Sequence, residues 1–250
     1  MKFDLHVHTD ASPDSRATFA EMLSAAKRAG LSGIAVCNHN VFSPPPESEL
    51  LCIPACEYST DVGHLLVYFL IADLELDRDP AGRFHWQDVI ARAHEQGALV
   101  FLAHPFAPEV SRPPELFSQL DGVEAYNARI VHSRAPRPNE RAAALSARAY
   151  SAGSDAHDPA EVGAAYWEIP GVSTLEEVRS ALAQGRGALF GGTANPLCRA
   201  KSQWIAFAKK PTAKKLLKNL VRTVYSAGQA VFVPRVPIHP IRKDEPHETV

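Results

Sequence analysis

Histidine and carboxylate side chains stand in close pairs at two distant places in this sequence. His6 and His8 are two residues apart near the N-terminus, and Asp155 and His157 repeat this spacing. In an extended strand, residues two apart point to the same side, so each pair can offer two ligands to one ion. Imidazole and carboxylate groups suit ions such as Zn, Mn and Fe. The two pairs therefore indicate a metal site.

Four more candidate ligands adjoin segments that we predict to be strands, and they are His39, Glu57, His64 and His104. In a parallel α/β barrel the loops that follow the strands converge on one face, so these side chains would meet the two pairs in one cleft. A lone histidine is more often a satisfied structural residue, and chance explains the His6 and His8 pair equally well when it is taken alone. The convergence of several strand ends favours the metal site.

Strand-like and helix-like segments alternate from Lys2 to about Gly192, which is typical of an α/β fold with a parallel sheet. Residues 3–8 alternate apolar and polar, and Thr18 and Glu21 form a capping box ahead of a helix. Residues 52–56 are a strand candidate that Pro54 weakens. The other strands are predicted at 33–37, 64–71, 98–102, 123–126 and 188–190, and the other helices at 86–96, 139–150 and 175–182.

Residues 195–250 differ in charge from the rest of the chain. They hold 11 Lys and Arg against 3 Asp and Glu, a net charge of +8, whereas residues 1–194 carry −10 and the whole chain −2. We therefore predict two domains, an α/β barrel at 1–194 and a basic, mainly helical C-terminal extension with a Pro-rich end at 195–250.

The extension contains a cluster of large apolar residues. We expect them to be buried against the barrel, because burial of each large side chain contributes about 1.5–3 kcal/mol. They are Trp204, Ile205, Phe207, Leu216, Leu217, Leu220, Val221 and Val224.

The composition, 46% hydrophobic and 22% charged, excludes disordered and collagen-like classes. The first residues have no apolar signal-like stretch, and no segment offers about 18 uninterrupted apolar residues. The four cysteines are too few and too irregularly spaced for a disulfide framework. We expect a soluble, cytoplasmic protein without a membrane partner.

Taken in order, the motifs resemble those of the PHP (polymerase and histidinol phosphatase) superfamily. They are Asp4 to Thr9, Ser12-Pro13-Asp14, Asn38-His39-Asn40, Glu57 to His64, Ala103-His104-Pro105, Asn127-Ala128-Arg129 and Gly153 to His157. The resemblance covers residues 2–192. It implies a distorted seven-stranded, TIM-like (βα) barrel, two or three divalent metal ions (Zn, Mn or Fe) at the C-terminal ends of the strands, and phosphoester hydrolysis.

The resemblance also implies a ligand set. The first ion is assigned to His6, His8, Glu57 and Asp155, the second to Glu57, His64 and His104, and the third to Asp14, His39 and His157. The family commonly has Thr-Asp-His where this chain has Cys37-Asn38-His39. Because Asn38 adds no negative charge, we expect weaker metal binding near His39.

The mechanism implied is attack by a water activated between divalent ions, without a side-chain nucleophile. His157 or His64 could protonate the leaving group. Arg129 is our candidate for holding phosphate oxygens, with Arg16 and Arg134 as alternates, although a surface salt bridge explains each arginine equally well.

The function predicted is hydrolysis of a phosphoester of a small phosphorylated metabolite or nucleotide. An alternative is a PHP-type nuclease or nucleic-acid-binding protein that uses the basic extension, against which the acidic body argues. A third is a barrel that has lost catalysis, which the nearly full ligand set disfavours. The sequence indicates neither the substrate's identity nor an oligomeric state.

Overall fold

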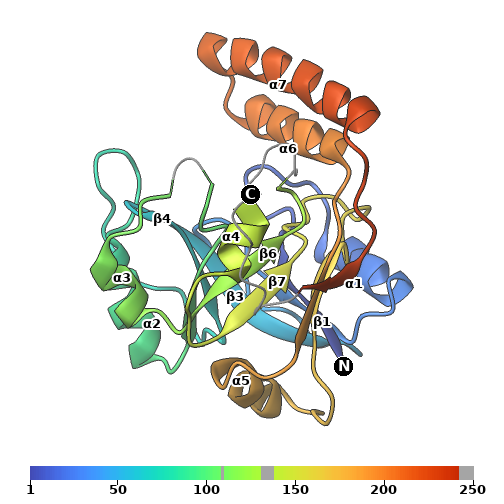
Figure 1. Ribbon diagram of the computed structural model, residues 1–250. Coiled ribbons are helices and arrows are strands. Elements are labelled where there is room, and N and C mark those ends of the chain that lie inside the picture. The colour runs from blue at the N-terminus through green and yellow to red at the C-terminus, as the bar shows by residue number, and fades with distance from the viewer. Residues whose placement is uncertain (108–109, 131–137, 242–250) are drawn as a thin grey trace, which may run out of the picture.

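The computed structural model describes residues 1–107, 110–130 and 138–241 (Figure 1). Its strands are β1 (Lys2–Val7), β2 (Gly33–Val36), β3 (Leu51–Thr60), β4 (Gly63–Tyr68), β5 (Leu99–Leu102), β6 (Gly122–Asn127), β7 (Tyr150–Gly153), β8 (Ala165–Glu168), β9 (Ala188–Gly191) and β10 (His239–Ile241). Its helices are α1 (Phe19–Arg28), α2 (Trp86–Glu95), α3 (Pro114–Gln119), α4 (Pro138–Ala143), α5 (Leu175–Ala183), α6 (Pro196–Lys209) and α7 (Ala213–Phe232).

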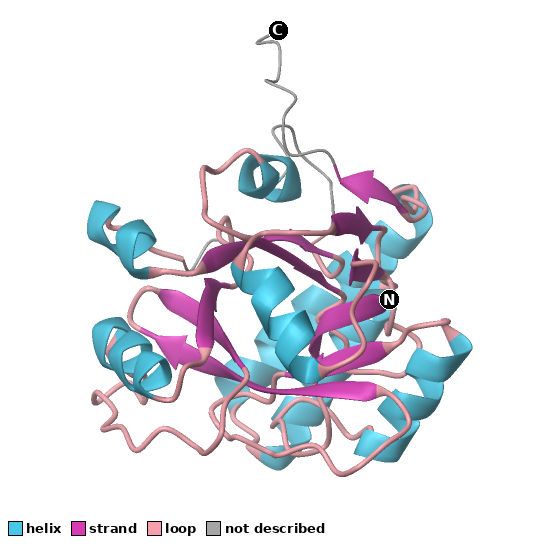
Figure 2. Ribbon diagram, turned by 90° about the horizontal axis from the view of Figure 1, so that it is seen from below, coloured by secondary structure: helices cyan, strands magenta, loops and turns pink. Residues whose placement is uncertain are grey.

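The strands form one ten-stranded sheet in the order β10-β9-β8-β1-β2-β3-β4-β5-β6-β7. Figure 2 shows the strands curving rather than lying in a flat layer. The curl brings the end of β7 back to β1, where Val7 and Ala156 form a parallel bridge and the His8 N–H donates to the Ala156 carbonyl at 2.8 Å. The segment with His6 and His8 and the segment with Asp155 and His157 therefore lie side by side.

The mixed α/β class is confirmed, but the sheet differs from a seven-stranded (βα) barrel. Five of its nine neighbouring strand pairs are antiparallel. The turn of Asp61 and Val62 joins β3 directly to β4, and a turn this short permits only an antiparallel pair with no helix between the strands. The chain thus replaces one βα unit by a hairpin.

The doubtful segment around Pro54 is part of β3. Pro54 pairs with Val36 at the last position of the β2–β3 ladder, so its missing N–H interrupts no further pairing there. Its carbonyl accepts hydrogen bonds from the Phe69 and Leu70 N–H groups at 2.7 and 3.2 Å. A position at the end of the β2–β3 ladder and two accepted hydrogen bonds thus make the proline compatible with this interior strand.

The helices that cover the sheet begin and pack as their sequences predict. The capping box of α1 is present, with the Thr18 N–H donating to Glu21 Oε2 at 2.7 Å and the Glu21 N–H donating to Thr18 Oγ1 at 3.3 Å. The buried face of α1, with Met22 and Ala26, packs in one apolar cluster with Ile34 of β2. This packing holds β1 and β2 in place from outside the curl.

The last two helices pack on each other, and α7 is the outermost element at one end of the molecule (Figure 1). Our prediction that their apolar residues are buried is wrong for α7, whose Leu217, Val221 and Val224 are 65%, 63% and 74% exposed. Its buried side chains are instead polar, among them Asn219 and Gln229. In α6, Ile205 is buried as expected.

Polar partners explain this inverted orientation of α7. The Asn219 side-chain amide donates to the Gln203 carbonyl at 2.8 Å, and Trp204 Nε1 donates to Thr223 Oγ1 at 2.8 Å. The two helices therefore meet through hydrogen bonds.

Over the described ranges, every helix is too short or too polar to cross a lipid bilayer.

Candidate metal centre

A glutamate in the second half of β3 lies at the centre of a histidine cluster. Glu57 is 1% exposed, and its two carboxylate oxygens face different partners. Oε1 is 2.8 Å from His64 Nδ1 and 3.4 Å from His104 Nε2. Oε2 is 2.8 Å from His39 Nδ1 and 3.5 Å from Nε2 of both His6 and His8. A carboxylate with this arrangement can bridge two ions.

The aspartates extend the cluster on the other side of β1. Asp155 Oδ1 lies 3.3 Å from His8 Nε2 and 3.7 Å from His6 Nε2. Asp14 Oδ2 lies 3.1 Å from His157 Nε2 and 3.6 Å from His39 Nε2. The structure therefore brings all nine sequence-predicted ligands into one continuous cluster.

The side chains of the cluster fit metal ions because their ligand atoms lack hydrogen-bond partners. Three overlapping groups keep their ligand atoms within 4.8 Å of one another, namely His8, His39 and His157; His6, His8 and Glu57; and His39, Glu57 and His64. Buried atoms without a hydrogen bond include Nε2 of His6, His8 and His157 and Oδ1 of Asp14. His39 Nδ1 and Glu57 Oε2 are 2.8 Å apart, but the pair lacks the angles of a hydrogen bond. Each buried atom without a hydrogen bond costs roughly 1–3 kcal/mol unless a partner satisfies it. Divalent ions would satisfy several at once.

The charges of the cluster are strongly coupled. Burial alone would raise the pKa of Glu57, but the neighbouring His64 and His39 outweigh it and hold this pKa well below its usual range. Burial and the neighbouring His157 hold the pKa of His8 well below its usual range. Burial opposes the charged form of His39, yet Glu57 and Asp14 raise its pKa to about 10. Metal binding at this cluster would therefore release protons from imidazoles such as His39.

A further carboxylate, Glu124 of β6, orients two members of the cluster. Glu124 Oε1 lies 2.9 Å from His6 Nδ1, and Glu124 Oε2 accepts the His104 N–H at 2.8 Å and the Asn127 side-chain amide at 3.1 Å. A proton on His6 Nδ1 leaves its Nε2 lone pair facing the cluster. Sequence reasoning missed Glu124, although a glutamate inside the apolar strand 123–126 was a visible signal.

Asn38, the departure from the family's pattern, acts mainly through Ser12. Asn38 Oδ1 accepts hydrogen bonds from the Thr9 N–H at 2.7 Å and the Ser12 hydroxyl at 3.2 Å. Ser12 Oγ in turn lies 3.0 Å from His8 Nδ1 and accepts the His39 N–H at 3.0 Å. Asn38 therefore fixes His8 as well as the backbone at His39.

The loop that carries Asp155 and His157 is tied to β1. Asp4, which is fully buried, accepts the Ser154 N–H at 2.8 Å and the Gly163 N–H at 2.9 Å. A Cβ on Gly153 would stand 2.3 Å from His6 Cβ, so only glycine permits this approach of β7 to β1. Asp155 has a φ of 56°, in the left-handed region. Such backbone strain is common at functional sites.

Arg129, the predicted phosphate ligand, lies beside His157 and is largely buried. Its Nε donates to Glu161 Oε1, its Nη2 to Ser202 Oγ, and its Nη1 lies by His157 Nδ1, each at 2.9 Å. Two of its five N–H donors are thus held by oxygen acceptors and a third lies against His157 Nδ1, which leaves two. Arg16 is exposed and lines a pocket of about 190 Å³ that also contacts His157. The other alternate, Arg134, lies outside the described residues.

Helix α6 reaches the cluster, which sequence reasoning did not predict. Ser202 holds Arg129, and Lys209 Nζ donates to the carbonyls of Ser12 at 2.8 Å and Ser15 at 3.2 Å, on either side of Asp14. These contacts join residues 73 and about 195 positions apart in the chain. No local pattern in the sequence could have indicated them.

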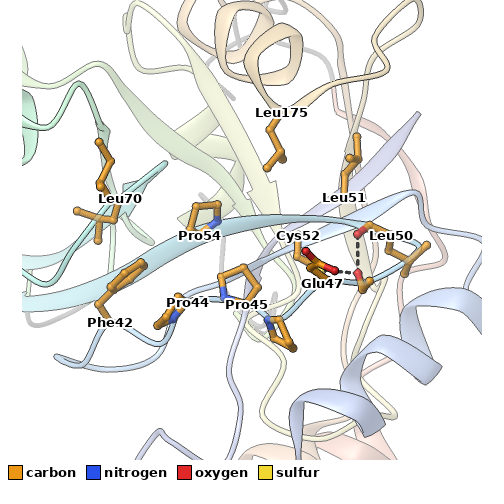
Figure 3. A pocket seen from close by; sticks show the side chains of 13 residues that line it. Phe42, Pro44, Pro45, Glu47, Leu50, Leu51, Cys52, Pro54, Leu70 and Leu175 are labelled. Atoms are coloured by element: carbon orange, nitrogen blue, oxygen red, sulfur yellow. Dashed lines mark hydrogen bonds between the residues drawn. The ribbon is translucent and has the colours of Figure 1, made fainter.

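A separate pocket of about 430 Å³ adjoins the N-terminal half of β3 (Figure 3). Its lining is mainly apolar, with Phe42 and Pro45 from the preceding loop and Leu175 from α5. None of the nine ligands lines it. The chemistry-bearing residues are therefore elsewhere, at the opposite end of β3.

Comparison with known families assigns the chain. Its sequence matches the PHP domain over residues 4–134 and a PHP-associated family over residues 136–186. The chain therefore belongs to the PHP domain family, as the order of its motifs predicted.

Two relatives come from the archaeon Methanocaldococcus jannaschii. The uncharacterized protein MJ1587 is 29% identical over 147 residues, which are 51% of this chain and 82% of the relative. The uncharacterized protein MJ0417 is 30% identical over 178 residues, which are 66% of this chain and 69% of the relative. Both are thus similar over most of their own length.

Two solved structures share the fold. PsfC from Pseudomonas syringae has a TM-score of 0.57 at 18% identity, with 91% of this chain and 98% of PsfC covered. A two-domain protein from Bacteroides vulgatus, described as containing a predicted PHP-like metal-dependent phosphoesterase, has a TM-score of 0.54 at 21% identity. The match covers 76% of this chain and 64% of that protein, so this chain spans less than two thirds of it.

Proposed function

We propose that this protein is a metal-dependent phosphoesterase that hydrolyses a phosphoester of a small metabolite or nucleotide. The observation that carries the proposal is the buried cluster around Glu57, in which ligand atoms of His, Glu and Asp face one another without hydrogen bonds. Membership of the PHP domain family supports the same reading.

We assign two or three divalent ions (Zn, Mn or Fe) to the cluster. Glu57 stands between two sets of histidines, with His64 and His104 on Oε1. His6, His8 and His39 face Oε2. All nine ligands lie within residues 1–194, which we take as the phosphoesterase unit. Divalent ions held there would stabilise charge on phosphoryl oxygens and activate water for attack at phosphorus.

The side chains around the ions have separate tasks. His64 is the more accessible proton donor for the leaving group, since its side chain is 27% exposed against 3% for His157. Arg129 contributes its two remaining N–H donors to phosphate oxygens, while Glu161 and Ser202 hold the guanidinium in place. Glu124 and Ser12 keep His6 and His8 in the tautomers that present Nε2 to the cluster.

The proposed partner is a small phosphorylated substrate in the cytoplasm. The four cysteines are buried and free, which suits a reducing compartment. A nuclease reading gains little support from α7, because large apolar side chains form the middle of the face it turns to solvent and basic side chains lie only beside them. Phosphate backbones are bound through basic and stacking surfaces instead.

The test is a phosphatase screen on metal-stripped protein resupplied with Mn, Zn or Fe. Substrates would include histidinol phosphate, nucleotide mono- and bisphosphates, sugar phosphates and short single-stranded DNA. We expect phosphate release from a small substrate that requires added metal and is absent in Glu57→Gln purified in the same way. Activity that persists without metal, or equally in Glu57→Gln, would overturn the proposal.

A second measurement distinguishes the mechanism. Hydrolysis of a substrate whose phosphate is made chiral with oxygen isotopes should invert the configuration at phosphorus, because a single direct attack by water inverts it and a phosphoenzyme route would retain it. A trapped phosphoenzyme would contradict this mechanism, although the requirement for metal would be unaffected.

A further inference from the structure

The face of α7 that points away from the molecule is formed by large apolar side chains. Among them, Leu217, Val221, Val224, Val231 and Phe232 are 63–82% exposed. The helix is 20 residues long, so this face extends over about 30 Å. A soluble monomer rarely leaves so continuous an apolar surface in water, and such surfaces mark sites of interaction.

The exposure of this face follows from how α7 is held. Its opposite side carries Asn219, Ser226 and Gln229, which are 4–6% exposed and turned toward the body. Asn219 and Thr223 hydrogen-bond to Gln203 and Trp204 of α6. Because α7 is fastened through its polar side, its apolar side is left for a partner outside the chain.

Basic side chains flank the apolar face. Lys218 and Arg222 are four residues apart on α7, beside the apolar face. Lys210 lies just before the helix. None of these three makes an ion pair within the described part of the chain. The sequence has no Asp or Glu between residues 195 and 243. The partner must therefore accept apolar side chains and supply negative charge beside them.

A second copy that packs its own α7 on this face does not supply that charge. Two α7 helices packed face to face would bring the same cations together, because residues 195–243 hold no Asp or Glu. An anionic lipid surface offers both an apolar interior and negative headgroups. Since α7 is the outermost element at its end of the molecule (Figure 1), it can lie on such a surface without obstruction.

We propose that α7 binds the surface of an anionic membrane, with its axis in the plane of the membrane and its apolar face among the headgroups. This proposal replaces our expectation from the sequence that the protein has no membrane partner, because that expectation assumed a buried apolar face on α7. The helix lies on the bilayer and does not cross it, in keeping with its polar inner side. The inference is independent of the phosphoesterase assignment, because it involves no residue of the metal cluster.

The test is co-sedimentation of the full chain with vesicles of phosphatidylcholine alone or mixed with phosphatidylglycerol. We expect binding to the mixed vesicles to be tighter, on the order of 100-fold for three basic residues near the surface, and to weaken with salt. The Val224→Asp variant should lose binding to both. The double variant Lys218→Glu, Arg222→Glu should lose only the preference for the anionic lipid.

Ile71→Asp is the matched control, because Ile71 is 77% exposed and lies by the pocket of Figure 3, away from α7. It should bind as the unchanged protein does, and circular dichroism should show all variants folded. Failure of the unchanged protein to bind either vesicle would overturn the proposal. So would a stable dimer in light scattering that Val224→Asp dissociates, since a second copy would then cover the face.

Discussion

The metal cluster and α7 reverse the usual rule of burial in opposite ways. In the cluster, charged and polar groups such as Glu57 and His8 are buried without hydrogen bonds for their inward-facing atoms. On α7, large apolar groups such as Val224 and Phe232 stand in water while polar side chains lie beneath. Each arrangement is costly within the chain alone.

The metal cluster and α7 also differ from the core of the sheet. In the rest of the described sheet, apolar residues such as Leu66 and Phe101 are fully buried. The metal cluster and α7 depart from this pattern, and we have proposed a partner for each, divalent cations for the cluster and an anionic membrane surface for α7. The following predictions test whether both departures have the energetic consequences expected of sites.

The largest effect is expected at Glu57. Glu57→Gln keeps the shape but removes the negative charge that faces five histidines, so we expect turnover to fall by at least about 100- to 1000-fold. Metal content should fall with it. Glu168→Gln is the control, since Glu168 pairs with Lys2 at the opposite end of β1 from His6. Equal activity of the two variants would show that Glu57 is not essential for catalysis.

Arg129 should have a large effect on stability. Arg129→Ala leaves the carboxylate of Glu161, whose side chain is 0% exposed, without its 2.9 Å partner. We expect the free energy of unfolding of metal-free protein to fall by about 3–5 kcal/mol in urea denaturation. The double variant Arg129→Ala, Glu161→Gln should recover part of the lost free energy of unfolding, because it removes the unpaired buried charge. A loss below about 1 kcal/mol, as for an exposed pair, would show that the pair is unimportant for folding.

Glu124 should change metal affinity more than stability. Glu124→Gln weakens the hold on His6 Nδ1, and residues that orient metal-bound histidines are worth roughly 10- to 100-fold in affinity. Titration of metal-stripped protein by calorimetry would measure this, with Glu168→Gln again as control. Unchanged affinity would mean that His6 is held in place by other contacts.

The smallest effect is expected on α7. Leu217→Ser should change the free energy of unfolding by no more than about 0.5 kcal/mol, because the side chain is already 65% exposed. Leu66→Ala, at a fully buried position of β4, should cost about 2–5 kcal/mol in the same assay. A comparable loss in both would mean that the apolar face of α7 is covered within the protein.

Much of the fold could be predicted where the signal is local. The alternation of residues 3–8 predicted β1, and the Thr18 and Glu21 pair predicted the start of α1. The hairpin of β3 and β4 was missed, because a barrel of alternating strands and helices was expected from the family resemblance. The helix predicted at 139–150 is shorter in the structure. It ends at Ala143, and Tyr150 is instead the first residue of β7.

The site could be predicted only as far as its strand-end positions. Eight candidate ligands were found because strand ends converge, and Asp14 was added by the family resemblance. The structure brings all nine together, although their binding of metal stays a prediction. Ser202 and Lys209 could not be found, because they reach the site from α6 across long sequence separations. Likewise, the amphipathic pattern of α7 does not specify which side faces the protein, and hydrogen bonds to Gln203 and Trp204 decided it.

The central claim, that the buried cluster is a metal centre, is tested most directly by counting ions. Metal-stripped protein would be titrated with Zn, Mn or Fe, and the bound ions per chain measured by elemental analysis after desalting. We predict two or three ions for the unchanged chain and at least one fewer for the double variant His6→Ala, His8→Ala. The same number of bound ions in both proteins would contradict the assignment.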